Sequence, residues 1–231
     1  MEKFSLYEIL SFLLPGFVLI GIVQLYQKYV FGCEQLLFSS DSKFSESIIL
    51  LCLSLFTGVL IHILTYWLVR YKKNNWFKNI IMPSVQKITD NDKFTQRTIP
   101  FLNDEYRRIR KHNENQVKEG EIENNLFDFA YYYLEVNGKI SAAKNFQSLY
   151  FWFRNMFTVS CFLIPVSIVI TAIALHKGYA CNRTDSAILI MTINLIILFI
   201  IIPAARWLRT KYVDKVLWSY YVERIHQNEK K

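Results

Sequence analysis

The residues with the clearest potential for chemistry are an arginine and a histidine in the basic run YRRIRKH. Arg107 and His112 are separated by four residues. A histidine can transfer a proton near neutral pH, and an arginine can hold a phosphate close to a developing negative charge. The run is also explained as the solvated face of a basic helix, which is the interpretation that we favour.

The R-x4-H spacing resembles the motif of HEPN-type ribonucleases, in which two copies of the motif meet across a dimer. The resemblance implies a catalytic role for Arg107 and His112, and it makes a membrane-tethered HEPN-like ribonuclease an alternative function. The basic cluster formed by Arg107, Arg108, Arg110 and Lys111 can instead bind RNA, a protein partner or anionic lipid headgroups. The sequence has no P-loop, dinucleotide-binding, zinc-protease or serine-hydrolase motif. We therefore expect a protein that is not a conventional enzyme and that has no cofactor.

A second polar group lies inside the uncharged run Ile48–Val69. Its members share one helical face at spacings of three or four residues: Ser54, Thr57, Gly58, His62 and Thr65. His62 is the only ionisable residue well inside any predicted span, and such residues are candidate functional sites. Small and hydroxyl side chains on one face also permit close helix packing, which we favour. A water-lined face in a channel or small-solute transporter is the alternative.

The four cysteines do not form a metal-binding pattern, because none is part of a C-x-x-C motif or lies near a pair of histidines. Cys33 and Cys181 fall in short loops predicted on the same, oxidising side of the membrane. Adjacent spans can bring their Cα atoms within about 6 Å, the separation that a disulfide requires. They are therefore the candidate disulfide pair, and no metal site is expected.

These residues must be positioned by long apolar helices. Ile48–Val69 has 22 residues without Lys, Arg, Asp or Glu, and a helix of that length reaches roughly 33 Å, enough to cross a hydrocarbon core of about 30 Å. Three further apolar runs cover about 9–31, 157–175 and 187–205. The apolar runs are long and unbroken, which favours helices over the short alternating strands of a β-barrel. The sequence predicts an all-α integral membrane protein with four transmembrane helices and a small cytoplasmic helical domain.

The predicted organisation alternates membrane hairpins with polar segments. Residues 1–69 hold the first transmembrane hairpin, 70–147 a basic cytoplasmic helical region, 148–205 the second hairpin and 206–231 an amphipathic helical tail. In this layout 23 of the 27 Lys and Arg residues fall on one side. The positive-inside rule therefore places both termini and the central region in the cytoplasm.

Two patterns predict that membrane helices continue beyond the bilayer. Ser141 can cap a helix whose pattern runs on to Leu175, a rod of roughly 50 Å. In the tail, apolar residues recur at every fourth position: Leu208, Tyr212, Val216 and Tyr220. An apolar face on Ile122–Glu135 is the expected packing partner of this stripe.

Two stretches resemble a known group of proteins. LYEILSFLLPGF in the first span and AAKNFQSLYFWFRNMF at the third are similar to small multi-pass bacterial membrane proteins of phage-defence loci. The four-span layout resembles the accessory proteins encoded beside the RNA-guided RNA nuclease of type VI-B CRISPR systems. The resemblance implies an inner-membrane accessory or effector protein that modulates or responds to an RNA-targeting partner. A sister accessory family, described as HEPN-like and pore-forming, implies a homo-oligomer that perturbs the lipid bilayer. Neither stretch is a catalytic motif, so no functional residue is transferred.

Overall fold

The computed structural model describes residues 6–32, 43–70, 75–85, 88, 98–104, 106–107, 119–176 and 181–229 of the chain. Regular structure in these ranges is entirely helical, which confirms the predicted fold class. The chain divides into two compact units. Unit 1 comprises residues 1–77 and 151–205, and unit 2 comprises residues 78–150 and 206–231.

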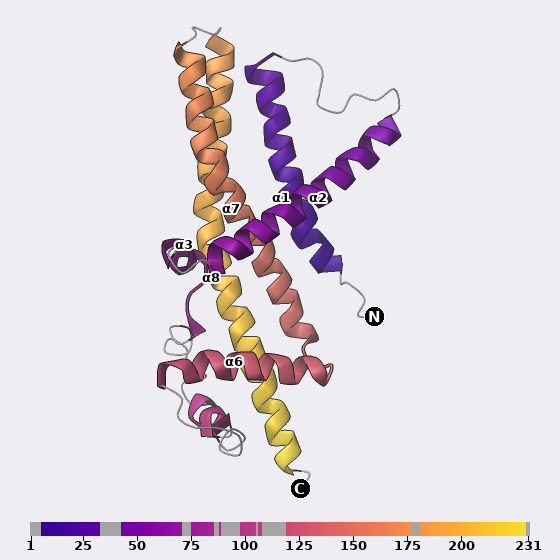
Figure 1. Ribbon diagram of the computed structural model, residues 1–231, viewed down its shortest axis with the longest axis vertical. Helices are drawn as coiled ribbons and strands as arrows, with labels where there is room; N and C mark the ends of the chain where they lie inside the picture. Colours follow the sequence, from indigo (N-terminus) through magenta and orange to yellow (C-terminus); the bar gives the residue numbers. More distant parts are fainter. Residues whose placement is uncertain are drawn as a thin grey trace. The chain divides into compact units, whose positions relative to one another are not determined.

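Four helices are long and apolar enough to cross a membrane, as the sequence predicts. They are α1 (Leu6–Leu25) with the π-helix η1 (Tyr26–Val30) that continues it, α2 (Lys43–Arg70), α7 (Ser141–His176) and α8 (Cys181–Glu229) (Figure 1). A π-helix is wider than an α-helix and is frequent at functional sites. The apolar pattern did not indicate that the first span would end in one. The protein is a multi-pass membrane protein.

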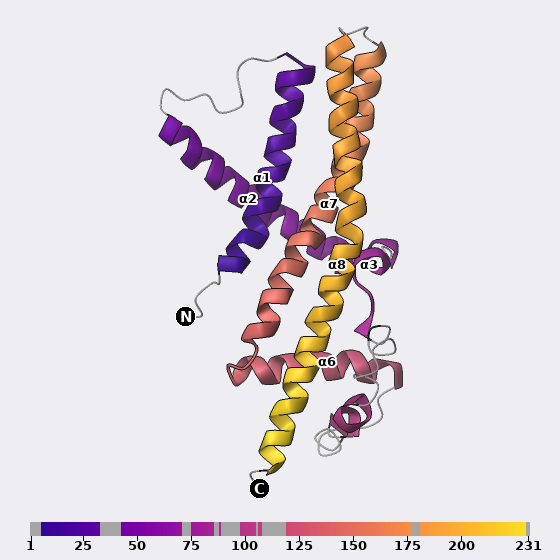
Figure 2. The same cartoon turned by 180° about the vertical axis from the view of Figure 1, so that it is seen from behind.

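Within unit 1, α1 and α2 cross at close range (Figures 1 and 2). A Cβ atom added at Gly16 would lie 1.8 Å from the Ser54 carbonyl oxygen, and one added at Gly58 would lie 1.8 Å from the Phe12 carbonyl oxygen. Both distances are much shorter than a van der Waals contact, so neither position has room for a Cβ atom. The two backbones therefore touch because each helix presents a glycine at the crossing.

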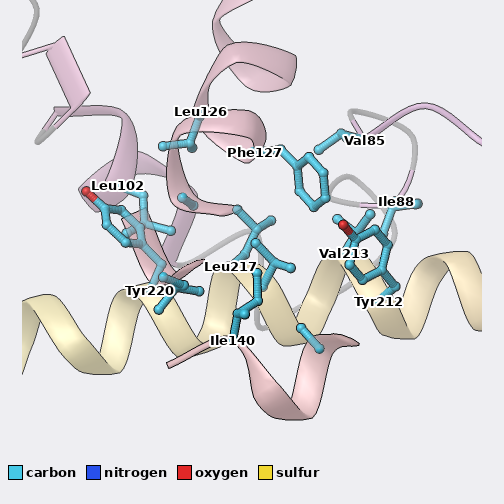
Figure 3. Packing of buried hydrophobic residues seen from close by; sticks show 14 of the residues in the cluster. Val85, Ile88, Leu102, Leu126, Phe127, Ile140, Tyr212, Val213, Leu217 and Tyr220 are labelled. Carbon is cyan, nitrogen blue, oxygen red and sulfur yellow. The ribbon is translucent and has the colours of Figure 1, made fainter. Parts of the chain in front are cut away.

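Unit 2 is built around the C-terminal part of α8, with α6 (Glu119–Val136) lying across it (Figures 1 and 2). The tail stripe is buried as predicted: Leu208, Tyr212, Val216 and Tyr220 are each at most 4% exposed. Figure 3 shows Leu126 and Phe127 of α6 on one side of α8, with Leu102 and Ile140 from other segments. The predicted packing of the tail on the 122–135 helix is confirmed.

A tight turn leads from α6 into α7. The Gly138 N–H donates to the Glu135 carbonyl and the Lys139 N–H donates to the Leu134 carbonyl, at 3.0 and 2.8 Å. Gly138 has a φ of 67°, which glycine adopts without steric cost. These two bonds satisfy carbonyl groups that the end of α6 would otherwise leave open. The Asn137-Gly138 pair thus ends one helix and lets Ser141 begin the next.

One arginine is part of the unit 2 interior. Arg209 is only 7% exposed, and its guanidinium carbon lies 5.2 to 5.7 Å from the ring centroids of Phe127, Tyr150 and Tyr212. A cation above aromatic faces is attracted by the negative face of each ring. In the sequence, Arg209 is one of the 23 Lys and Arg residues on the predicted cytoplasmic side.

Candidate functional site

A polar cluster lies inside unit 1, where α1, α2 and α7 meet. Its side chains are His62 of α2 with Arg154 and Asn155 of α7, and its backbone member is the Ser11 carbonyl of α1. Arg154 is 6% exposed and Asn155 is fully buried. A guanidinium and an amide are costly to bury in apolar surroundings unless they find partners. The cluster is therefore the strongest functional candidate within the described residues.

Both α7 residues approach the same nitrogen of His62. The Arg154 Nη2 lies 3.3 Å and the Asn155 Nδ2 lies 3.2 Å from His62 Nδ1. Guanidinium and amide nitrogens only donate hydrogen bonds, so Nδ1 must be the acceptor. The imidazole is then neutral, with its proton on Nε2. Asn155 Nδ2 also lies 3.3 Å from the Ser11 carbonyl, so one amide joins α7 to both other helices.

Aromatic rings enclose the imidazole. Phe12 meets His62 edge-on with ring centroids 4.8 Å apart, and Phe151 does so at 5.5 Å. The Arg154 guanidinium lies 4.6 Å from the Phe151 centroid, within the range of a cation–π interaction. Phe151 therefore contacts both the imidazole and the guanidinium.

Three residues after His62, a second contact ties α2 to α7. The Thr65 and Thr158 hydroxyl oxygens are 2.7 Å apart, and Thr158 Oγ1 lies 3.3 Å from the Arg154 carbonyl. Thr65 Oγ1 also lies 2.7 Å from the Ile61 carbonyl. Each hydroxyl has one proton, so Thr65 donates to Thr158 when Thr158 donates to the Arg154 carbonyl, and Thr158 donates to Thr65 when Thr65 donates to the Ile61 carbonyl. Both threonines are buried. The pair fixes the register of α2 on α7 beside the polar cluster.

Among the side chains that the structure describes, the cluster combines one permanent cation, one neutral imidazole and one amide. Such a set can orient hydrogen bonds and attract a negative charge. It lacks a nucleophile next to a base, the arrangement that covalent catalysis requires. Among the described residues, no group of three His, Cys, Asp or Glu side chains is placed to hold a metal ion.

The predicted polar face of α2 lies mostly inside the structure. Ser54, Gly58 and Thr65 are buried, and Thr57 and His62 are half-buried. The Gly58 backbone contacts the backbone of α1, and the side chains of His62 and Thr65 contact α7. This geometry favours helix packing over a water-lined path along that face.

Other predicted site residues fall largely outside the described part of the chain. Arg107 is described and exposed, whereas Arg108, Arg110, Lys111 and His112 lie outside the described residues. Cys33 and the side chain of Cys181 also lie outside them. The HEPN-like pairing, the basic binding cluster and the disulfide therefore stay predictions.

Arg154 and Asn155 are site residues that the sequence analysis missed. Arg154 precedes the third apolar run by three residues, and in the sequence it is one of the 23 Lys and Arg residues on the predicted cytoplasmic side. The neighbouring sequence carried a usable signal, because Arg154-Asn155 is followed by Thr158 and Ser160, a polar band around the start of the span. A polar band on one apolar helix and a histidine on another favour contact between the two helices.

Comparison of the chain with protein-family models, with curated protein sequences and with solved structures finds no match.

Proposed function

We propose that this protein is a non-enzymatic membrane accessory or effector protein of prokaryotic antiviral defence. In this role it modulates or responds to a cytoplasmic RNA-targeting partner. The defence context rests on the resemblance of residues 6–17 and 142–157 to membrane proteins of phage-defence loci. The partner type follows from the same resemblance and from the basic segment around Arg107.

The observation that carries the proposal is that two membrane helices also build unit 2. α7 supplies residues 141–150 to unit 2 and 151–176 to unit 1, and α8 is divided at residues 205 and 206. Arg154 of the polar cluster lies four residues, about one helical turn, after Tyr150, the last residue of α7 in unit 2. A partner that binds unit 2 thus acts on α7, the helix that carries Arg154 and Asn155 of the polar cluster.

The charge distribution supports a bacterial inner-membrane location with both termini in the cytoplasm. Unit 2 and the flanking segments carry most of the Lys and Arg residues, and the other side of the predicted spans carries only four. Basic segments stay on the cytoplasmic side during insertion. In this orientation Arg107 and its basic neighbours face cytoplasmic RNA and proteins. A homo-oligomer that perturbs the bilayer is the form in which we expect an effector to act.

The test is phage challenge of bacteria that express an RNA-guided RNA nuclease with or without the full chain. We expect the chain to change plaque formation relative to the nuclease alone. Arg154→Gln, which removes the buried charge, is expected to abolish this change at equal membrane abundance. Lys211→Gln, which removes an exposed charge on α8, is the control and should act like the unchanged protein. Plaque counts that the chain does not alter would refute the proposal.

The alternatives give different results with purified protein. A HEPN-like ribonuclease would cleave RNA without a partner, and both Arg107→Ala and His112→Ala would abolish cleavage. A channel would pass ions across liposomes that contain the chain alone. We expect neither activity from the purified chain, and either one would replace the accessory role.

A further inference from the structure

Four buried polar groups in unit 1 have no hydrogen-bond partner among the residues that the structure describes. They are the hydroxyls of Tyr26, Ser167 and Thr171 and the side-chain nitrogen of Asn194. Each of these residues is at most 8% exposed, and all four lie inside predicted spans. A hydroxyl or an amide that is buried without a partner is costly, most of all in a bilayer. Four such groups in one unit therefore point to a polar ligand.

Three helices bring these groups to one region. Tyr26 is the first residue of η1, and it belongs to one apolar cluster with Ala174 of α7 and Ala187 of α8. α7 and α8 lie side by side and run in opposite directions (Figures 1 and 2). Ser167 precedes Ala174 by seven residues and Asn194 follows Ala187 by seven, which is about 10 Å or two helical turns in each case. Ser167 and Asn194 therefore lie at the same height.

Tyr26 reaches this height from the first span. The Tyr26 and Ser167 side chains interact, but neither hydroxyl has a partner with hydrogen-bond geometry. Thr171 follows Ser167 by four residues, so it lies on the same face of α7, one turn away. The four groups are thus neighbours that do not satisfy one another.

We propose that these groups bind ordered water between η1, α7 and α8. A buried water molecule makes about three hydrogen bonds to polar groups that would otherwise lack partners. Water can accept from the Asn194 amide nitrogen, which only donates, and it can accept from or donate to the hydroxyls of Tyr26 and Ser167. The bound water would join the first span to the second transmembrane hairpin. The proposal is independent of the defence role.

The ligand is neutral because the site offers no charge to balance an ion. The four predicted spans contain no Asp or Glu, and their single Lys or Arg residue is Lys28, which is exposed. An ion without a compensating charge is far more costly to bury than a neutral molecule. The burial of all four polar side chains favours a molecule as small as water.

The test is water-edited solid-state NMR of the full, isotope-labelled chain in lipid bilayers. This experiment measures how quickly magnetisation passes from water to each side chain. We expect transfer to the buried Asn194 amide at a rate close to that of Asn137, whose side chain is exposed. The methyl group of Ala187, fully buried two turns away, should receive it much more slowly. A rate at Asn194 as slow as that at Ala187 would overturn the proposal.

Substitutions distinguish a water-bound group from an unpartnered one by the sign of their effect. Replacing an unpartnered buried amide by an apolar side chain stabilises a protein, whereas losing a bound water destabilises it. We expect Asn194→Leu and Ser167→Ala each to lower the midpoint of denaturant unfolding in detergent micelles. The double variant should lose less than the sum, because both changes remove bonds to the same water.

The matched control is Thr192→Val, because Thr192 is exposed on α8 and bonds only a carbonyl of its own helix. This variant should leave the unfolding midpoint close to that of the unchanged chain. A higher midpoint for Asn194→Leu, or additive losses in the double variant, would overturn the proposal. The NMR rates of the unchanged chain decide the question even if a variant does not fold.

Discussion

Single residues decide how α2 and α7 hold together inside unit 1. The Thr65–Thr158 hydroxyl contact is 2.7 Å long and buried. Hydrogen bonds between membrane helices average about 0.6 kcal/mol and reach about 1.7 kcal/mol, because the separated helices also find partners in the bilayer. The contact is therefore expected to contribute modestly to stability and strongly to register.

Thr158→Val should lower the free energy of unfolding by about 0.6–1.7 kcal/mol, since it keeps the shape and removes the bond to Thr65. The measurement is denaturant titration of the full chain in detergent micelles. Thr192→Val is the control, because Thr192 is exposed and bonds only the Ile188 carbonyl of its own helix. Equal losses in the two variants would mean that the interhelical bond contributes nothing.

The ionisation of Asp128 makes the stability of unit 2 depend on pH. Asp128 is exposed on one side, and its partial desolvation by the rest of unit 2 raises the pKa above the ordinary value of 3.8, whereas the Arg209 charge opposes this shift. A carboxyl whose folded pKa lies above its unfolded pKa destabilises the fold when it is ionised. This penalty is present above the folded pKa, declines as the pH falls through that value, and is absent below the unfolded pKa.

Asp128→Asn should therefore stabilise unit 2 at pH 7, and the gain should vanish below about pH 3.9, where the unfolded carboxyl is protonated. The measurement is the thermal midpoint of the near-ultraviolet circular dichroism signal for both proteins across this range. A lower midpoint for the variant at pH 7 would mean that the attraction of Arg209 exceeds the cost of burying the carboxylate.

At the scale of elements, two glycines on one helix should respond in opposite ways to the same change. Gly16→Ala places a methyl group against the Ser54 backbone, and overpacking of this kind typically costs about 1–3 kcal/mol. Gly21→Ala enters open space and should be neutral or slightly stabilising, because alanine favours helix. The fraction of chain that stays monodisperse in detergent after heating compares the two. A loss in Gly21→Ala as large as that in Gly16→Ala would contradict the close crossing.

The packing of α8 in unit 2 can be tested with two valines. Val213 is fully buried in the cluster around α8, whereas Val136 at the end of α6 is 86% exposed. Val213→Ala should destabilise unit 2 by about 2 kcal/mol, from two lost methyl groups and the cavity that they leave. Val136→Ala should change stability by less than about 0.5 kcal/mol. Hydrogen exchange of the α6 amides in the full chain measures the stability of unit 2 in both variants. Similar protection of these amides in the two variants would argue against this core.

At the scale of the whole molecule, the proposed orientation makes a prediction about access. In a chain with its native cysteines replaced, single cysteines at Ser40 and Thr184 should react with a membrane-impermeant reagent in intact spheroplasts. A cysteine at Asn115 should react only after the membrane is opened, because 23 of the 27 Lys and Arg residues hold that side in the cytoplasm. Labelling of Asn115 from outside would invert the topology and place the basic segment away from cytoplasmic RNA.

The sequence by itself determined the four membrane helices and much of unit 2. Ile48–Val69 must form a helix in a bilayer because only internal hydrogen bonding satisfies its backbone there. The length of α7 follows from a helix start predicted at Ser141 and a helical pattern that continues after it. The stripe from Leu208 to Tyr220 indicated a buried face because its period matches the helical repeat. These are local properties, repeated along one element.

Only the tertiary structure decided the surroundings of Arg154, Gly21 and Asn194. Hydropathy and periodicity describe one helix at a time, so they identify Arg154 as a charge near the end of a span. Its burial beside His62 depends on which helices pack together and at what height. Gly16 and Gly21 have the same chemistry and the same helix, and they differ only in what lies opposite. A site made by several helices is therefore a property of their packing, which no single segment encodes alone.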